Sequence, residues 1–222
     1  MLRIIGRIAE VAEGQAGLVT EQQAAACKAS PAVLHEFLEA RVIEIAIPGV
    51  VRLRGGTRPP FPQLYAHWLL LAPDEPAWER PLPAAGVVSH GAAVRVYAVG
   101  SLPGPAAEFT VPPSHTAASS HNVLIHRAEL GPQDYRDVAG LPVTSPGRTL
   151  ADIAAAGSTD LEGLGRIATN FLQQQLATRD ELAQALEALN LSGTAGTGAE
   201  RLSYLLASVD GAEAAADSGM GA

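Results

Sequence analysis

The chain has 222 residues, 47% of them hydrophobic, and carries 15 Lys and Arg against 23 Asp and Glu, a formal net charge of −8. This balance of apolar and charged residues is that of a globular protein and excludes a disordered chain. The acidic surplus excludes a protein that simply coats nucleic acid, because phosphate binding takes most of its affinity from Lys and Arg.

The charge is unevenly distributed along the chain. Residues 1–60 hold seven Lys or Arg and six Glu, a net of +1, whereas residues 61–222 hold eight Lys or Arg against seventeen Asp or Glu, a net of −9. Any contact with nucleic acid is therefore expected in the first quarter of the chain.

The sequence carries no signal for export or membrane insertion. Its longest apolar run, around residues 68–72, falls far short of the ~20 residues that a membrane helix needs. The first fourteen residues are interrupted by Arg and Glu and lack the apolar centre of a secretory signal. Cys27 is the single cysteine, so no intrachain disulfide can form. We expect a cytoplasmic protein without membrane contact.

Three helices are predicted at the beginning of the chain. Apolar side chains recur at helical spacing over residues 1–14. Thr20 is a suitable N-cap for a short helix over 21–27. Ser30 followed by Pro31 is a cap with proline at the first helical position, and it begins the third helix.

Two short β-rich runs follow over residues 42–54. They flank Pro48 and Gly49, a pair suited to the second and third positions of a type II turn. The order helix, short helix, helix, hairpin predicts a winged helix-turn-helix domain over residues 1–58.

A second domain is predicted over residues 62–210, after a segment rich in Gly and Pro. Its expected elements are a helix (64–72), a strand (87–88), a helix after Ser89 (90–100), two strands (107–111 and 122–128) and four helices beginning near residues 146, 160, 179 and 200. Small polar residues over 211–222 predict a flexible tail. The fold class is expected to be α+β, a winged helix followed by a mixed, mostly helical domain.

The stretch LPVTSPGRTLADIA, residues 141–154, concentrates polar side chains in an otherwise Ala-rich region. Ser145 and Pro146 are predicted to begin a helix in which Arg148 and Asp152 lie one turn apart and pair. One interpretation is a capped helix whose ion pair braces the domain. The other is an anion-receptive patch at the helix start. Its residues would be Thr144, Ser145, Arg148, Thr149 and Asp152.

No catalytic motif is found in the sequence. It lacks the P-loop, the kinase glycine loop and the GxSxG nucleophile turn, so we predict no catalytic residue and no cofactor. His115, His121 and His126 are not predicted to bind a metal, because no Cys or spaced carboxylate completes the set. His90 is expected to satisfy a local hydrogen bond.

The order of four segments after the winged helix resembles the AbiEi family of antitoxins. These segments are VVSHGAAVRVYAVG (87–100), EFTVP (108–112), VLIHRAEL (123–130) and GLPVTSPGRTLADIA (140–154). The resemblance covers about residues 5–210. It implies the antitoxin half of a bacterial type IV toxin–antitoxin pair, whose toxin is a nucleotidyltransferase of the polymerase-β type. It also implies a winged helix that binds inverted repeats in its own promoter and represses the operon.

The DNA-contacting surface implied by the resemblance would use the third helix and the wing. Its candidate residues are Lys28, Ser30, His35, Arg41, Arg52 and Arg54. Glu36 and Glu39 on the same helix oppose phosphate, and the wing tip has no cation.

Three interpretations of the function therefore stay open. The first is an antitoxin that binds operator DNA weakly as a homodimer. The second is an antitoxin whose winged helix serves only as a protein-interaction surface. The third is an enzyme that inactivates the toxin by covalent modification such as phosphorylation, using side chains of residues 144–152.

Overall fold

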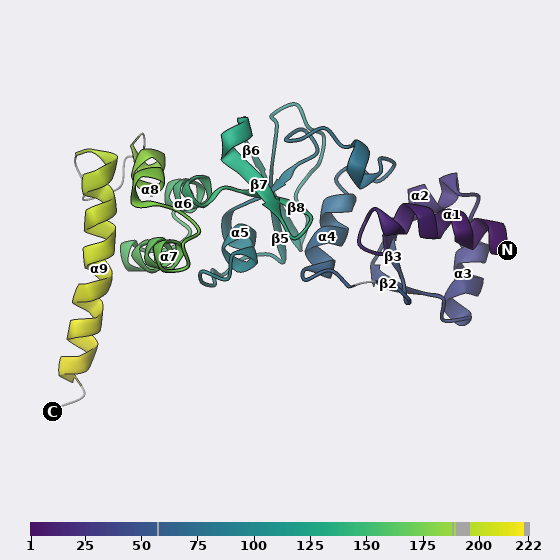
Figure 1. The fold of residues 1–222 in the computed structure, drawn as a ribbon, viewed down its shortest axis with the longest axis horizontal. Coiled ribbons are helices and arrows are strands. Elements are labelled where there is room, and N and C mark those ends of the chain that lie inside the picture. The colour runs from purple at the N-terminus through teal and green to yellow at the C-terminus, as the bar shows by residue number, and fades with distance from the viewer. Residues whose placement is uncertain (57, 188, 190–195, 220–222) are drawn as a thin grey trace.

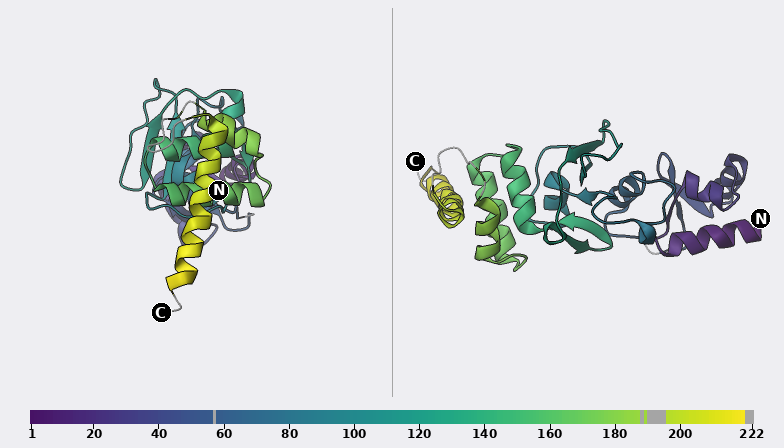
Figure 2. Two further views of the ribbon diagram at one scale, coloured as in Figure 1. Left: turned by 90° about the vertical axis from the view of Figure 1, so that its left-hand side faces the viewer. Right: turned by 90° about the horizontal axis from the view of Figure 1, so that it is seen from above.

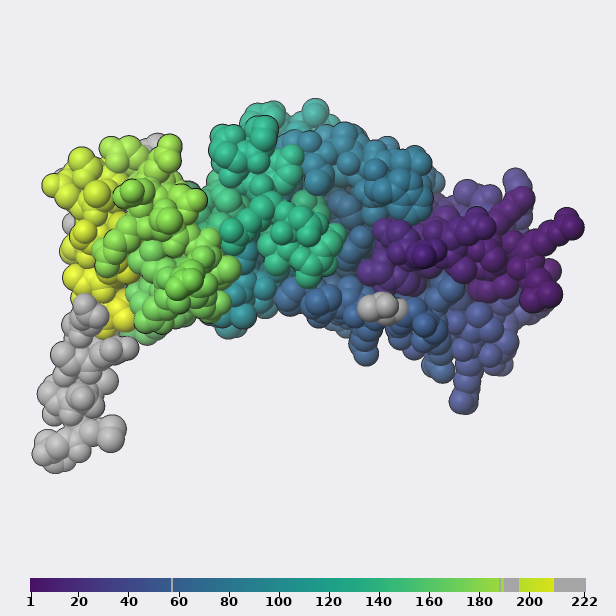
Figure 3. All heavy atoms as spheres, viewed as in Figure 1, coloured from purple at the N-terminus to yellow at the C-terminus, as the bar shows by residue number. Residues whose placement is uncertain are grey.

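The computed structural model describes the backbone of residues 1–56, 58–187, 189 and 196–219, and the side chains among these as far as residue 209. The described chain is elongated (Figures 1 and 2). The N-terminal helices and their sheet form one end, a second sheet lies in the middle, and the last helices form the other end. The same order is visible on the surface in Figure 3.

The N-terminal region has the element order of a winged helix, and its three predicted helices and hairpin are confirmed. The elements are α1 (Leu2–Glu13), β1 (Leu18–Thr20), α2 (Glu21–Ala26), α3 (Pro31–Glu39), β2 (Ile43–Ile47) and β3 (Val50–Leu53). Thr20 forms a capping box with Gln23, and the Ser30 hydroxyl accepts from the Val33 amide. Gly49 has φ +86°, which the third position of a type II turn requires.

Strand β1 was not predicted, and it adds a third strand to the hairpin in the order β1-β3-β2. Its three residues are all buried, so it shows no alternation of apolar and polar positions. Side chains of α1, α3 and β2 meet in a compact core around Ile8, Phe37 and Ile43.

Helix α4 (Pro62–Leu69) follows, and it ends earlier than the predicted residue 72. Buried Arg80, just after the short 3-10 helix η1 (Ala77–Glu79), donates from its guanidinium to the carbonyl oxygens of Trp68, Leu69 and Ala72. The same guanidinium lies 4.6 Å from the centroid of the Trp68 ring. Arg80 thus satisfies carbonyl groups that the end of a helix leaves free.

The segment after α4 ties the N-terminal region to the rest of the chain. The Thr20 hydroxyl donates to the Pro73 carbonyl, and the Gln23 amide donates to the Glu75 carbonyl at 2.9 Å. Gln15 accepts from the Ala77 amide at 2.9 Å. Leu18 and Val50 belong to the larger apolar core that runs through the second region. The two regions therefore share buried contacts.

The central sheet has five strands in the order β6-β5-β4-β8-β7. The strands are β4 (Val87–Val88), β5 (Ala107–Val111), β6 (Val123–Arg127), β7 (Tyr135–Val138) and β8 (Leu141–Thr144). Strands β4 and β8 are parallel, as are β5 and β6, and the other two pairs are antiparallel. The sequence predicted β4, β5 and β6 but missed β7 and β8.

The second region has five further helices: α5 (His90–Val96), α6 (Pro146–Ala155), α7 (Leu161–Gln173), α8 (Arg179–Leu186) and α9 (Gly198–Gly219). Helix α5 packs on strands β5 and β8, α6 packs on α5, α7 and α8, and α9 packs on α7 and α8. All five were predicted, but α9 continues beyond the expected end at Val209. The expected tail therefore has a helical backbone as far as Gly219, and residues 220–222 lie outside the described residues. The predicted α+β class is confirmed.

Among the described residues, no helix has both the length and the apolar character needed to cross a membrane.

Candidate functional site at the edge of the central sheet

Two of the sequence motifs meet at one edge of the central sheet, namely the edge at which strands β4 and β8 have their carboxyl ends. Parallel neighbours β4 and β8 pair at Val88 and Val143, and each strand leads directly into a helix. Ser89 and His90 lead into α5, and Ser145 leads into α6. The carboxyl ends of parallel strands are where α/β sheets place their binding sites. The motif residues therefore converge although they are far apart in sequence.

The predicted pair of Arg148 and Asp152 is present. The Arg148 Nε donates to Asp152 Oδ1 at 2.8 Å, and its Nη1 lies 3.4 Å from Asp134 Oδ2. Burial raises the pKa of the Asp152 carboxyl, and the hydrogen bond from Arg148 opposes that rise. The second carboxylate oxygen, Oδ2, is buried and has no hydrogen-bond partner among the described residues. Arg148 thus provides the main compensation for a buried carboxyl group.

Thr144 and Thr149 are fully buried and bond to each other. Their hydroxyl oxygens lie 2.7 Å apart, and the Thr149 hydroxyl donates to the Thr144 carbonyl at 3.0 Å. Ser145 is the N-cap residue of α6, as predicted, but its side chain makes no capping hydrogen bond. The two threonines join the end of β8 to the first turn of α6.

A cavity of about 620 Å³ opens beside the start of α6. Its lining includes Ser145, Gly147 and Arg148 from the start of α6, Arg136 from β7, and Glu181 and Gln184 from α8. Of the five residues expected in the anion-receptive patch, Ser145 and Arg148 line this cavity, whereas Thr144, Thr149 and Asp152 do not. The lining also includes Asp134, so the guanidinium groups of Arg136 and Arg148 share the cavity with the carboxylates of Asp134 and Glu181.

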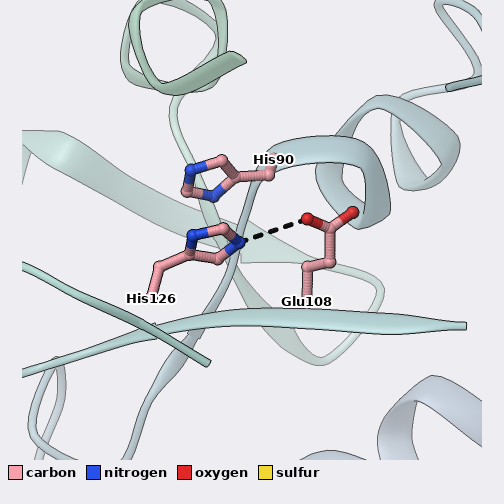
Figure 4. A group of neighbouring side chains, drawn as sticks. All are labelled: His90, Glu108 and His126. Atoms are coloured by element: carbon pink, nitrogen blue, oxygen red, sulfur yellow. Dashed lines mark hydrogen bonds and ion pairs between the residues drawn. The ribbon is translucent and has the colours of Figure 1, made fainter. Parts of the chain in front are cut away.

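A second group at this edge was missed by the sequence analysis (Figure 4). His90, Glu108 and His126 each offer a ligand atom within 4.8 Å of the others. The rings of His90 and His126 stack with centroids 3.4 Å apart, and His126 Nε2 lies 3.2 Å from Glu108 Oε2. His90 also makes the local hydrogen bond expected of it, with Nδ1 2.9 Å from the Ser89 hydroxyl.

The group was missed because its members come from three separate segments. His126 was grouped with His115 and His121, its neighbours in sequence, whereas the sheet places it next to His90 and Glu108. The signal available was a histidine in two of the four segments that resemble the AbiEi family, at positions 90 and 126. Strand β6 pairs with β5 in the register that places Thr110 opposite His126, and this pairing brings His126 close to Glu108.

The six predicted DNA-contacting residues lie on the N-terminal region. They differ from one another in exposure and in the contacts of their side chains. Lys28, His35 and Arg41 are exposed. The Ser30 hydroxyl is used as the cap of α3. Arg52 and Arg54 both pair with Glu44, at 2.7 Å and 3.3 Å. The Arg52 hydrogen bond holds the pKa of the Glu44 carboxyl below its usual range, so this carboxylate offsets two wing cations.

Fold and site together define a two-part α+β protein, in which a region with winged-helix order is joined to a mixed sheet whose motif residues gather at one edge. The sequence profile described as "AbiEi antitoxin C-terminal domain" matches residues 81–208. The chain belongs to the AbiEi antitoxin family, and the resemblance seen in the sequence is confirmed. The profile match includes every residue of the sheet-edge site named above.

Among solved structures, the crystal structure of the Rv2827c protein from Mycobacterium tuberculosis is similar to this chain. The TM-score is 0.51 at 17% sequence identity, and the alignment covers 93% of this chain and 77% of that one. At 17% sequence identity, this similarity shows a shared fold and nothing about function. A comparison with curated proteins gives no significant match.

Proposed function

We propose that the protein is the antitoxin of a two-gene toxin–antitoxin pair and neutralises a nucleotidyltransferase toxin. The observation that carries the proposal is the family match over residues 81–208, which includes both the cavity beside α6 and the three-residue group at the sheet edge. A toxin of this class handles nucleotide phosphates, and the cavity offers the guanidinium groups of Arg136 and Arg148. This end of the second region is the proposed toxin-facing surface.

We further propose that the N-terminal region binds operator DNA weakly and as a homodimer, and thereby represses its own operon. Support comes from the winged-helix order and from exposed Lys28, His35 and Arg41. Two features reduce the expected affinity. Glu36 and Glu39 on α3 are exposed and repel phosphate. Arg52 and Arg54 pair with Glu44, which offsets their charge. If DNA is not bound at all, the same surface serves as a protein-interaction surface.

Co-expression tests the antitoxin proposal. The neighbouring gene should encode a nucleotidyltransferase, and its induced expression should stop growth unless this protein is made in the same cells. The matched control is the same toxin with its nucleotidyltransferase site inactivated, which should be harmless alone. An unrelated neighbour, or a toxin whose effect persists when both proteins are soluble and abundant, would remove the proposal.

The intact mass of the toxin separates neutralisation by binding from covalent modification. After incubation of the toxin with this protein and ATP, we expect an unchanged mass and a complex that elutes together in gel filtration. A toxin heavier by one phosphate would instead assign an enzymatic role, with the cavity at Arg136 and Arg148 as its location.

A further inference from the structure

We propose that His90, Glu108 and His126 form a binding site for a divalent transition metal, and that Zn²⁺ is the ion that fits best. The three side chains come from the start of α5, from β5 and from β6 (Figure 4). Their candidate ligand atoms, one ring nitrogen from each histidine and one carboxylate oxygen, all lie within 4.8 Å of one another. Among the described residues, these three form the group of His, Cys, Asp or Glu side chains whose ligand atoms lie close enough together to share a metal ion.

The distances suit a metal after a small rearrangement. In a tetrahedral zinc site with bonds of 2.0–2.1 Å, ligand atoms lie about 3.3 Å apart. The two imidazole rings are stacked at an interplanar angle of 9°, and a shared metal requires them to turn out of this parallel arrangement. Rotation about the Cβ–Cγ bond of histidine is soft, so this turn costs little.

The carboxylate of Glu108 faces the two histidines. Glu108 is buried, with 7% of its surface exposed, and the hydrogen bond described for its side chain is the one with His126 Nε2. A metal ion bound here would give this carboxylate a partner of opposite charge. The carboxylate lies in space that glycine leaves open, because a Cβ at Gly91 would come within 2.6 Å of Glu108 Oε1.

The backbone of His90 also suits a ligand. His90 has φ +50°, a left-handed conformation that is uncommon for a residue other than glycine and that clusters at functional sites. The Ser89 hydroxyl, 2.9 Å from Nδ1, orients the ring.

The donor set selects the class of ion. Two imidazoles and one carboxylate are the ligands of zinc sites that keep a fourth position for water or a bound molecule. Mg²⁺ and Ca²⁺ prefer oxygen ligands throughout, so they fit this set poorly. The site is distinct from the cavity beside α6, whose lining includes none of the three residues.

Metal titration of the full chain tests the proposal. Tag-free protein stripped with EDTA and dialysed is titrated with Zn²⁺ in a calorimeter, and Mg²⁺ is titrated in parallel. We expect one Zn²⁺ per chain with a dissociation constant of about 1 μM or lower, and no Mg²⁺ binding under the same conditions. Substitution of cobalt for zinc should give the visible absorption bands of a four-coordinate site.

Variants assign the binding to these residues. Glu108→Gln and His126→Asn should each weaken Zn²⁺ binding by roughly 10- to 100-fold or more, because each removes one of three protein ligands. His121→Asn, which changes an exposed histidine outside the group, is the matched control and should bind as the wild type does. Circular dichroism verifies that each variant is folded.

Three results would overturn the proposal. The first is wild-type protein that binds no Zn²⁺ or gives no four-coordinate cobalt spectrum, which needs no variant to fold. The second is a folded Glu108→Gln variant with wild-type affinity. The third is an equal loss of binding in His121→Asn.

Discussion

Arg148 connects three parts of the sheet-edge site through one guanidinium group. It pairs with Asp152 on its own helix and with Asp134 before β7, and its Nη1 also donates to the Glu129 carbonyl at 3.4 Å. Its side chain also lines the cavity beside α6. These contacts fit the brace, whereas the anion-receptive patch stays a prediction.

Replacing Arg148 by Ala separates these two roles. We expect a loss of about 2 kcal/mol in the free energy of unfolding, because the variant leaves the Asp152 carboxylate buried without its partner. Urea denaturation measures the loss, and toxin co-expression measures antitoxicity. Loss of both properties favours the brace, whereas loss of antitoxicity in a protein of wild-type stability favours the patch. Asp152→Asn is the control, since it removes the buried charge and keeps the Arg148 side chain.

Residue-scale features that depend on neighbours in sequence could be predicted. The caps at Thr20 and Ser30 and the pairing of Arg148 with Asp152 all follow from residue types within a few positions of one another, and all are present. The mutual bond of Thr144 and Thr149 was not predicted, because it depends on the burial of β8. The group at His90 required the register between strands, which no local pattern carries.

At the scale of elements, the helices were predicted better than the strands. Strand β8 was missed because its four residues are all buried and include a proline, so they show neither alternation nor an uninterrupted apolar run. Its partner β7 has a mixed exposure that a short sequence window does not distinguish from a loop. Strand β8 nevertheless lies beside β4 and leads into α6, so the missed strand is the one that positions the site.

Close packing of helices α7 and α9 yields a prediction at this scale. A Cβ at Gly165 in α7 would clash with the Leu205 carbonyl and would lie 2.8 Å from a Val209 methyl group. Gly165→Ala should therefore separate the two helices and destabilise the protein by about 2 kcal/mol. The measurement is the midpoint of urea unfolding.

Gly6 in α1 supplies the matched control for this substitution. A Cβ at Gly6 would have nothing within 4 Å, and the residue is exposed inside a helix. Gly6→Ala should stabilise the protein by about 0.5–1 kcal/mol through helix propensity. If both alanine variants change stability in the same direction, the packing explanation for Gly165 is wrong.

At the scale of the whole molecule, the distribution of charge limits the operator binding proposed for the N-terminal region. The region has a net charge of only +1 over residues 1–60, and Glu44 pairs with two of its cations. Residues 61–222 carry the acidic surplus, which repels phosphate at long range. For the operator binding proposed above, this distribution predicts a low affinity with a shallow dependence on salt.

Glu44→Gln should strengthen operator binding by releasing Arg52 and Arg54 from their shared carboxylate. We expect an affinity gain of about tenfold at low salt and a steeper salt dependence, because two more cations can neutralise phosphates. Gel-shift titrations with the protein's own upstream DNA measure both quantities. Glu13→Gln, which changes a carboxylate on α1 that makes no described ion pair, is the control. Absence of any shift with micromolar wild-type protein at low salt would remove the repressor proposal.

The buried contacts between the N-terminal region and the segment after α4 have a consequence for how such proteins evolve. Leu18 and Val50 belong to the core of the second region, and Gln23 donates to the Glu75 carbonyl across the junction. A gene rearrangement that exchanged the first sixty codons for those of another winged helix would leave these partners unmatched. The two regions are therefore expected to be inherited together, so that their sequences change in step between related proteins.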